Sequence, residues 1–324
     1  MHLRERDRAV LITGANGFIG RNLCKFLVAR NWRVVAATRQ ADAISGLGVQ
    51  VERLSLLEEP ERWQHALRSV NHVIHLAARV HALRRGDDDA ELFNTINVSG
   101  TAFVVQQAIA ARVKRLVLMS SVKVNGEGGV GVIYRAEDVP QPQGAYAKSK
   151  LMAEIVTRNE CARAGVQYVI VRPPLVYGPE VKANLRRLLR LVELGVPLPF
   201  RSIDNCRSLV GIENVVDFIQ TCMIHPLAAG KVWFVSDGDD LSTPELIRKL
   251  ARAFARNPRL FSFSPYLLQA IARVLGLGDE MQRLCDSLRV DITPARTLLQ
   301  WNPAVTAEMG LARAVQAYLS TRTC

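Results

Sequence analysis

The sequence predicts an α/β fold: a Rossmann-type doubly wound parallel sheet with a smaller C-terminal substrate-binding lobe. Three observations predict it. Short apolar runs alternate with amphipathic helical patterns through the first half of the chain. A glycine-rich turn joins the first apolar run to the first helical pattern. After about residue 175 the alternation gives way to Pro, Gly and short helices. Strand–helix–strand connections are right-handed, so they build a parallel sheet with helices on both faces.

Six short apolar runs in the first half predict strands, and the periodic segments between them predict helices. A seventh strand is expected at 231–235, and Ser242 with Glu245 has the spacing of a helix capping box. The other expected strands are 9–13, 33–38, 49–54, 72–76, 115–120 and 167–171, and the expected helices are 18–30, 63–70, 90–112 and 146–164.

Composition limits the class of protein. The chain has 324 residues, of which 49% are hydrophobic and 22% charged, so it can bury a large core. Its net charge of +12 favours anionic partners, but no nucleic-acid-binding motif accompanies the charge, so we expect none of that class. We expect no signal peptide, no membrane span and no metal site. The six Cys form no C-x-x-C pair, which fits a reducing, cytoplasmic location.

The turn after the first expected strand carries the clearest binding motif. Gly14, Gly17 and Gly20 give G-x-x-G-x-x-G between a strand and a helix. Glycine there permits a tight turn, close backbone approach to a pyrophosphate and close helix–strand packing, while the helix N-terminus supplies N–H donors. We therefore predict a dinucleotide site, with further contacts from Asn16, Phe18 and Ile19. Residues 1–175 are accordingly the expected NAD(P)-binding domain, and 176–324 the substrate-binding lobe, whose strand 231–235 returns to the sheet region.

The end of the second strand bears on which nicotinamide cofactor is used. An acidic residue there usually binds the ribose 2′-hydroxyl of NAD, but this chain has Arg39. A guanidinium suits the 2′-phosphate of NADP(H), which is the cofactor we favour. The alternative is an exposed arginine with NAD held by backbone contacts.

Three residues predict acid–base chemistry. Tyr146 and Lys150 form Y-x-x-x-K at the start of a helix, so both lie on one helical face. An ammonium beside a phenol lowers the phenol pKa from about 10, which lets Tyr146 exchange a proton with a sugar oxygen. Ser121, just after the fifth strand, is placed to hydrogen-bond the same oxygen.

With these residues, the chain resembles the extended short-chain dehydrogenase/reductase superfamily. It is most similar to the nucleotide-sugar epimerase/dehydratase branch that includes UDP-galactose 4-epimerases. The resemblance runs from about residue 9 to 303. It is carried by the glycine loop, His75-Leu76-Ala77-Ala78, Asn97, Ser121, Tyr146, Lys150 and the segment 172–179.

The resemblance implies roles for these residues. Tyr146 becomes the acid/base, Lys150 lowers its pKa and holds the nicotinamide ribose, Ser121 orients the sugar oxygen, and Asn97 braces the site. Leu76, Ala77, Ala78 and Pro173 are implied cofactor contacts, and Lys123, Asn184, Leu185, Pro199 and Arg207 implied substrate contacts, with Asn184 and Arg207 at the pyrophosphate.

Two departures from the family pattern matter. Asn125 stands where a Tyr is usual, so stacking near the nicotinamide is expected to differ. The second diphosphate-binding arginine has two candidates, Arg283 and Arg289. A 4,6-dehydratase is disfavoured, because Val122-Lys123 replaces the Asp-Glu pair which that reaction needs.

The expected chemistry is therefore hydride transfer at C4 of a UDP-sugar. We favour reduction of a UDP-4-keto-6-deoxy-N-acetylhexosamine with NADPH, in surface-polysaccharide (O-antigen) synthesis. A UDP-hexose or UDP-N-acetylhexosamine 4-epimerase with bound NAD is the alternative, and a non-catalytic dinucleotide sensor the third. The resemblance also implies a homodimer.

Two other features have open interpretations. His81 follows the fourth strand and either approaches the sugar or faces solvent. The apolar stretch 261–277, with Arg273 interleaved, either docks into the smaller lobe or makes peripheral membrane contact.

Overall fold

The computed structural model describes most of the chain. His81 falls outside the described residues, and so do the side chains of Asp87, Asp88, Asp89 and Asn184. The described residues are 8–40, 44, 46–56, 60–80, 87–180 and 183–321, with the side chains of 87–89, 183–184 and 279–280 left out.

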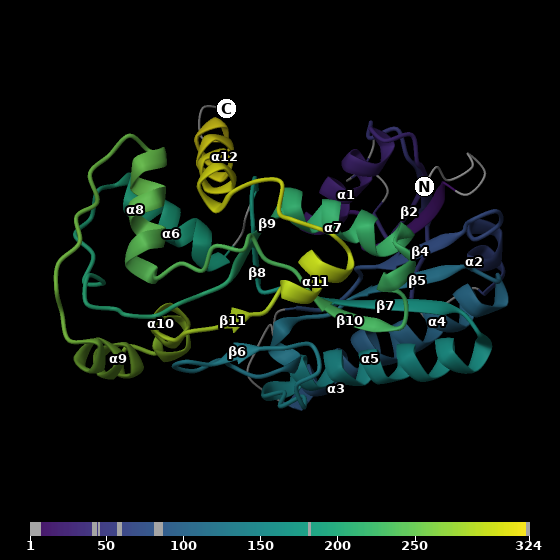
Figure 1. Ribbon diagram of the computed structural model, residues 1–324, viewed down its shortest axis with the longest axis horizontal. Coiled ribbons are helices and arrows are strands. Elements are labelled where there is room, and N and C mark those ends of the chain that lie inside the picture. Colours follow the sequence, from purple (N-terminus) through teal and green to yellow (C-terminus); the bar gives the residue numbers. More distant parts are fainter. Residues whose placement is uncertain are drawn as a thin grey trace.

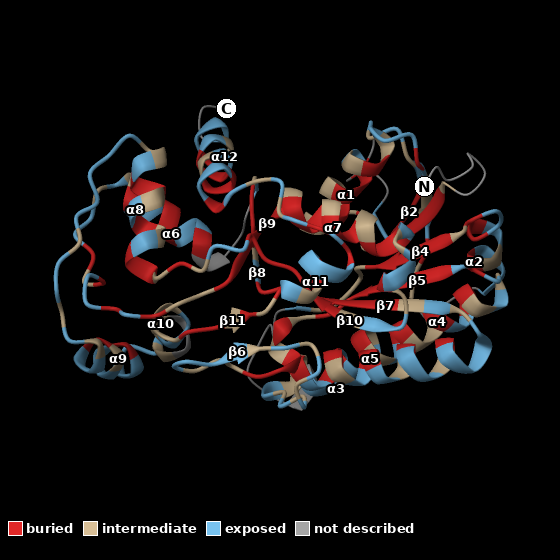
Figure 2. Cartoon of the chain, viewed as in Figure 1, coloured by how far each residue is buried: buried red, intermediate tan, exposed pale blue. Residues whose placement is uncertain are grey.

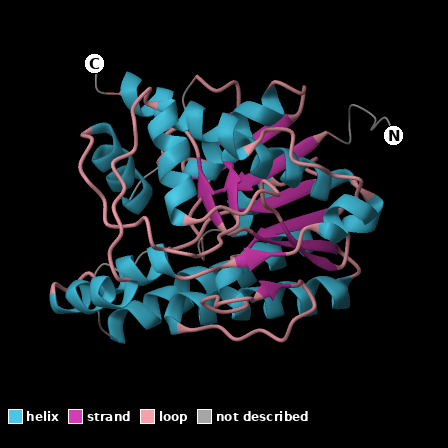
Figure 3. Ribbon diagram, turned by 60° about the vertical axis from the view of Figure 1, so that its left-hand side comes forward, coloured by secondary structure: helices cyan, strands magenta, loops and turns pink. Residues whose placement is uncertain are grey.

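A seven-stranded, all-parallel sheet forms the centre of the molecule (Figure 3). Its order, β10-β7-β5-β4-β1-β2-β3, reverses direction between β1 and β4, which is the topological switch point of a doubly wound fold. The predicted fold class is confirmed, including the return of a later strand to this sheet beside β7. The strands are β1 (Ala9–Thr13), β2 (Arg33–Thr38), β3 (Gln50–Arg53), β4 (His72–His75), β5 (Arg115–Met119), β7 (Gln167–Arg172) and β10 (Lys231–Phe234).

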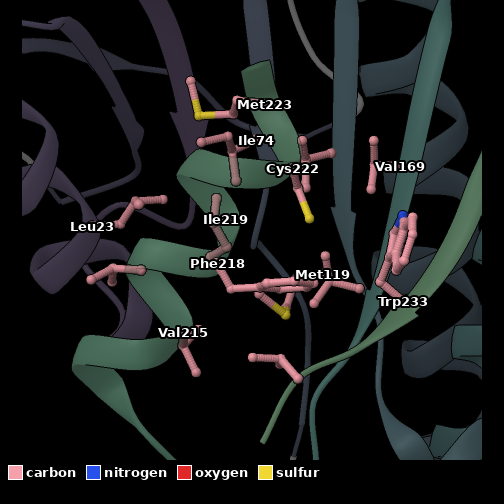
Figure 4. Packing of buried hydrophobic residues seen from close by; sticks show 14 of the residues in the cluster. Leu23, Ile74, Met119, Val169, Val215, Phe218, Ile219, Cys222, Met223 and Trp233 are labelled. Carbon is pink, nitrogen blue, oxygen red and sulfur yellow. The ribbon is translucent and has the colours of Figure 1, made fainter. Parts of the chain in front are cut away.

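Helices cover both faces of this sheet (Figure 1). One face packs against α1 (Phe18–Val28) and α7 (Ile212–Ile224), and Figure 4 shows Leu23, Phe218 and Trp233 within that cluster. The other face packs against α2 (Pro60–Ala66), α4 (Gly100–Ala110) and α5 (Gly144–Ala164). Strand residues alternate between the two clusters, as burial on both faces of a parallel sheet requires.

The helix expected at 90–112 is interrupted. The structure has α3 (Asp87–Phe93), a π-helical segment, η3 (Asn94–Ser99), and then α4. The apolar spacing could not reveal the extra residue of a π turn. Such turns recur at functional sites, and this one carries Asn97.

The structure contains short strands outside the main sheet that the sequence did not predict. Two short parallel pairs form, β8 with β9 and β6 with β11, whose two or three residues are too few to give a periodic signal. The capping box at Ser242 and Glu245 is confirmed. The boundary at 175/176 stays a prediction, because α7 and β10 come from the second half yet complete the sheet layers. The remaining elements are η4 (Val122–Val124), β6 (Ile133–Tyr134), β8 (Leu175–Tyr177), α6 (Ala183–Glu193), β9 (Leu209–Gly211), η5 (Pro226–Ala228), α8 (Thr243–Ala253), α9 (Pro265–Val274), α10 (Gly278–Cys285), β11 (Arg289–Val290), α11 (Thr293–Leu298) and α12 (Ala307–Ser320).

Within the described part of the chain, no helix is both long and apolar enough to cross a bilayer.

Candidate active site

The glycine loop forms a tight turn between β1 and α1. Gly14 has φ +65°, and a Cβ on it would lie 2.8 Å from the Ala77 backbone nitrogen. A Cβ on Gly20 would lie 2.2 Å from the Gly14 carbonyl oxygen. Only glycine fits at these two positions. Gly17 begins α1 without a side-chain cap, so the first backbone N–H groups of the helix are available to an anion.

The end of β4 lies directly against this loop. The backbone N–H groups of Leu76 and Ala77 donate to the Thr13 hydroxyl at 3.2 and 3.1 Å. The residues predicted to contact the cofactor from β4, Leu76 to Ala78, therefore border the glycine turn. Pro173, after β7, accepts a hydrogen bond on its carbonyl oxygen from the Val122 N–H at 3.0 Å, which places it beside the Ser121 turn.

Arg39 lies at the same edge of the sheet. It follows β2, which pairs with β1, and its side chain is exposed. The position is the one expected for a 2′-phosphate contact, and its role stays a prediction.

Tyr146 lies in the first turn of α5. Its ring packs edge-to-face against the Phe93 ring, with centroids 5.9 Å apart. Burial raises the pKa of Tyr146 above its usual 10, and a side-chain hydrogen bond with Ser121 partly opposes this rise. The sequence predicted that Lys150 lowers this pKa. In the chain by itself, desolvation of the phenolate is the largest effect and the net shift is upward, so a lowering contribution from Lys150 stays a prediction.

Lys150 is buried one helical turn after Tyr146. Burial lowers the pKa of Lys150 from 10.5 to about 8, and the negative charge of Glu154 opposes that change. The ammonium is therefore close to its titration point at neutral to mildly alkaline pH.

A buried network of polar side chains connects the glycine loop to α5. Thr13 contacts His75 Nδ1 at 2.7 Å, and His75 Nε2 contacts the Thr101 hydroxyl at 3.0 Å. Thr101 donates to the Asn97 carbonyl oxygen at 2.6 Å. The Asn97 amide donates to the Ser149 hydroxyl at 2.9 Å, and Ser149 donates to the Tyr146 carbonyl oxygen at 2.8 Å.

Asn97 also holds the loop after β4. Its Oδ1 accepts from the Arg79 N–H at 2.8 Å, and its Nδ2 donates to the Arg79 carbonyl oxygen at 3.0 Å. The bracing role that the resemblance implied for Asn97 agrees with these contacts.

A buried ion pair includes Glu154, which lies one helical turn after Lys150 on α5. Arg172 Nε and Nη2 donate to the two carboxylate oxygens of Glu154 at 2.9 and 2.6 Å, and Ser120 donates to the same carboxylate. Arg172 Nη1 donates to Asn125 Oδ1 at 2.9 Å. Asn125 is thus buried against Arg172. Its side chain completes this ion-pair network.

The candidate diphosphate side lies in the smaller lobe. Burial lowers the pKa of Arg207, Asp286 and Glu127 oppose that change, and the neighbouring cation of Arg283 adds to it. Arg289 forms an ion pair with Asp240 at 2.7 Å. Which of Arg283 and Arg289 is the second diphosphate contact stays a prediction.

The other predicted substrate residues differ in their placement. Lys123 lies beside Ser121 in the chain, but its ammonium forms an ion pair with Glu127. Leu185 is buried in the core of the lobe, so its side chain is unavailable to a ligand without rearrangement. Pro199 is partly exposed in the loop before Phe200.

Comparisons with known proteins agree with this geometry. A family model described as "NAD dependent epimerase/dehydratase family" matches residues 10–235. The chain belongs to this family. A UDP-glucose 4-epimerase of Vibrio cholerae is 38% identical, covering 98% of this chain and 97% of the relative. A 2-alkyl-3-oxoalkanoate reductase of Stenotrophomonas maltophilia is 29% identical over 94% of this chain and 97% of its own.

One solved structure has the same fold as this chain. It is the UDP-glucuronic acid 4-epimerase of Bacillus cereus in complex with NAD, with a TM-score of 0.78 and 21% identity. It covers 97% of this chain and 99% of its own.

Several residues of the site were missed by the sequence analysis. Thr13 ends a strand at the ligand edge of the sheet, and Thr101 lies four residues after Asn97. Glu154 likewise lies four residues after Lys150. Two patterns could therefore have identified these residues: a polar residue at a strand end, and a polar residue four positions after a motif residue on a helix.

Proposed function

We propose that this enzyme is an NAD(P)-dependent UDP-hexose or UDP-N-acetylhexosamine 4-epimerase. The observation that carries the proposal is the meeting of Ser121, Tyr146 and Lys150 with the glycine loop at one edge of the sheet. The 38% identical relative is a 4-epimerase matched over almost its whole length. This similarity supports the epimerase over the reductase that the sequence analysis favoured.

The site fits a nicotinamide dinucleotide. The uncapped start of α1, with the close approach at Gly14 and Gly20, suits a pyrophosphate, and Lys150 suits the ribose hydroxyls of the nicotinamide half. The Bacillus cereus structure contains NAD. When bound, the nicotinamide supplies an acceptor and donor of hydride.

Tyr146 is the proposed acid and base at the oxygen on C4. The Tyr146 phenolate takes the proton of the C4 hydroxyl as the C4 hydride leaves, which gives a C4 ketone. After the sugar turns, Tyr146 returns the proton while hydride returns to the opposite face, so the net reaction inverts C4 with no net oxidation. Ser121 holds the same oxygen, and the Lys150 ammonium stabilises the phenolate.

Arg207 and Arg283 are the proposed holders of the UDP diphosphate. Guanidinium groups bind phosphate oxygens in pairs, and two neighbouring cations become less repulsive when an anion lies between them. The lobe thus anchors the nucleotide while the sheet edge performs the chemistry.

A 4-ketoreductase acting on a UDP-4-keto-6-deoxy-N-acetylhexosamine is the second candidate. Arg39 favours it, because NADPH, the usual reductant in biosynthesis, has a 2′-phosphate that this guanidinium can bind. The reductase from Stenotrophomonas maltophilia shows that carbonyl reduction occurs among relatives. A non-catalytic sensor is disfavoured by retention of Ser121, Tyr146 and Lys150.

A substrate and cofactor matrix tests the proposal. Purified protein is incubated with UDP-glucose, UDP-N-acetylglucosamine or a UDP-4-keto-6-deoxy sugar, each with NAD, NADH or NADPH, and products are followed by ¹H NMR. The proposal expects C4 inversion with no net consumption of cofactor. Stoichiometric oxidation of NADPH by the keto sugar, without inversion of UDP-glucose, would establish the reductase instead.

A further inference from the structure

One helix of the smaller lobe presents an apolar face to solvent. In α9, Leu268 and Ala272 point into the lobe and are buried. Other large apolar residues of α9 and of the turn after it are exposed, and α9 lies at the outer edge of the molecule (Figure 2). We call this set the α9 face; it consists of Tyr266 (85% exposed), Leu267 (58%), Ile271 (49%) and Val274 (88%) in α9, with Leu275 (66%) and Leu277 (46%) after its end.

The chain around the α9 face is strongly basic. Between Glu245 and Asp279 the sequence contains Arg and Lys but no acidic residue. Lys249 and Arg252 form ion pairs with Glu308. The other cations form no ion pair with another described residue, and all are exposed: Arg248, Arg256, Arg259 and Arg273.

Backbone hydrogen bonds join the segment before α9 to the rest of the lobe. Leu198 donates its N–H to the Arg259 carbonyl oxygen at 2.8 Å and accepts from the Phe261 N–H at 3.1 Å. Phe261 is itself exposed. The Arg256 guanidinium reaches the turn at Gly195, between exposed Leu194 and Val196. The segment that leads into α9 therefore continues the same mixture of apolar and cationic groups.

We propose that the α9 face docks on the surface of an anionic phospholipid bilayer. An exposed helix whose apolar residues lie beside an arginine, here Arg273, with further arginines in the segment that leads into it, is an arrangement that lies in a membrane interface. Its exposed Tyr266 is of the residue type enriched at that depth. With ten residues, α9 lies in the interface and cannot span it.

The positive charge of this region argues against a second copy of the chain as the partner that covers the α9 face. A two-fold contact through the α9 face would pair this basic segment with a second copy of itself, which offers no opposite charge. Anionic headgroups instead provide the opposite sign. The proposal does not depend on which C4 reaction the enzyme performs.

Vesicle co-sedimentation of the full chain tests the proposal. We expect binding to vesicles of mixed phosphatidylglycerol and phosphatidylcholine, much weaker binding to pure phosphatidylcholine, and loss of binding at high salt. The double variant Leu267→Asp with Val274→Asp should lower the bound-to-free ratio at least about tenfold. Both positions are exposed, so we expect turnover of soluble UDP-sugar to be unchanged.

A matched control separates this effect from added negative charge. Leu227→Asp with Val139→Asp adds the same charge at positions that are 52% and 78% exposed and lie in η5 and in the loop before α5. This control should keep vesicle binding. The proposal is overturned if the wild type does not bind anionic vesicles, or if both double variants lose binding equally. It is also overturned if the α9 variant turns a dimer into a monomer by light scattering, since a second copy then covers the face. If UDP-sugar turnover is intact in any of these cases, only the membrane proposal fails and the proposed enzymatic function is unaffected.

Discussion

His75 donates a hydrogen bond from Nε2 to the Thr101 hydroxyl. The two atoms are 3.0 Å apart, and the single Thr101 proton is already donated to the Asn97 carbonyl oxygen at 2.6 Å, so the imidazole must be the donor. On the other side Thr13 accepts from two backbone N–H groups and donates to Nδ1. Every partner is satisfied only by the neutral Nε2–H tautomer.

Acidification should therefore destabilise the protein through His75. Burial, with the nearby charge of Lys150, lowers the pKa of His75 from 6.5 to about 3. Between those values the unfolded chain binds a proton that the folded chain excludes, so stability is complete above pH 6.5 and falls below it. From about pH 7.5 to about pH 5 the wild type should lose about 2 kcal/mol more than His75→Gln. Urea unfolding measures this, and equal losses in both proteins would refute it.

Lys150 should reduce stability at neutral pH. Its pKa is lowered from 10.5 to about 8, so in that range the unfolded chain binds more protons, and stability rises with pH. Lys150→Met should be more stable than the wild type at about pH 7.5, with an advantage that shrinks by about 2 kcal/mol at about pH 9.5. Turnover should be lost. A stability difference independent of pH in urea unfolding would contradict the burial of a charged ammonium.

The Glu154–Arg172 pair should be needed for folding. Glu154→Gln leaves a buried guanidinium with a neutral partner, which should cost about 3–5 kcal/mol of unfolding free energy. Glu160→Gln removes the exposed pair with Arg163 on the same helix and should cost less than about 1 kcal/mol. Thermal and urea unfolding of both variants measure this, and similar costs would contradict the network.

Arg39 should distinguish the two nicotinamide cofactors. Arg39→Ala should weaken NADPH binding about tenfold and leave NADH binding nearly unchanged, because only NADPH has the 2′-phosphate. Arg68→Ala, an exposed arginine after α2, should alter neither. Fluorescence titration gives both affinities. Equal weakening of both cofactors would mean that Arg39 does not contact the 2′-phosphate.

The sheet, its helices and the glycine loop could be predicted because each rests on a local signal. The apolar runs predict where each strand ends. Because the strands are parallel, their carboxyl ends lie at one edge of the sheet, and this predicts that Gly14, Ala77 and Ser121 lie close together there. The π-helical turn at Asn97 and the short strand at Leu175–Tyr177 have no such signal.

The electrostatic properties of the site could not be predicted from the sequence, because they depend on burial and on contacts between residues far apart in the chain. The residues near Tyr146 in the chain could be read from its motif, but its desolvation could not, so the net upward shift of its pKa was not predicted. The pairing of Arg289 with Asp240, and of Asn125 with Arg172, joins residues 49 and 47 positions apart. No spacing rule reaches that far along the chain.

The most direct test of the central claim is the rate of C4 inversion of UDP-glucose by Tyr146→Phe, followed by ¹H NMR. We predict a loss of at least about 100-fold, because the proton on the C4 oxygen then has no acceptor. Lys148→Met, an exposed change in the same helical turn, should keep the wild-type rate. Equal turnover in Tyr146→Phe and the wild type would contradict the account.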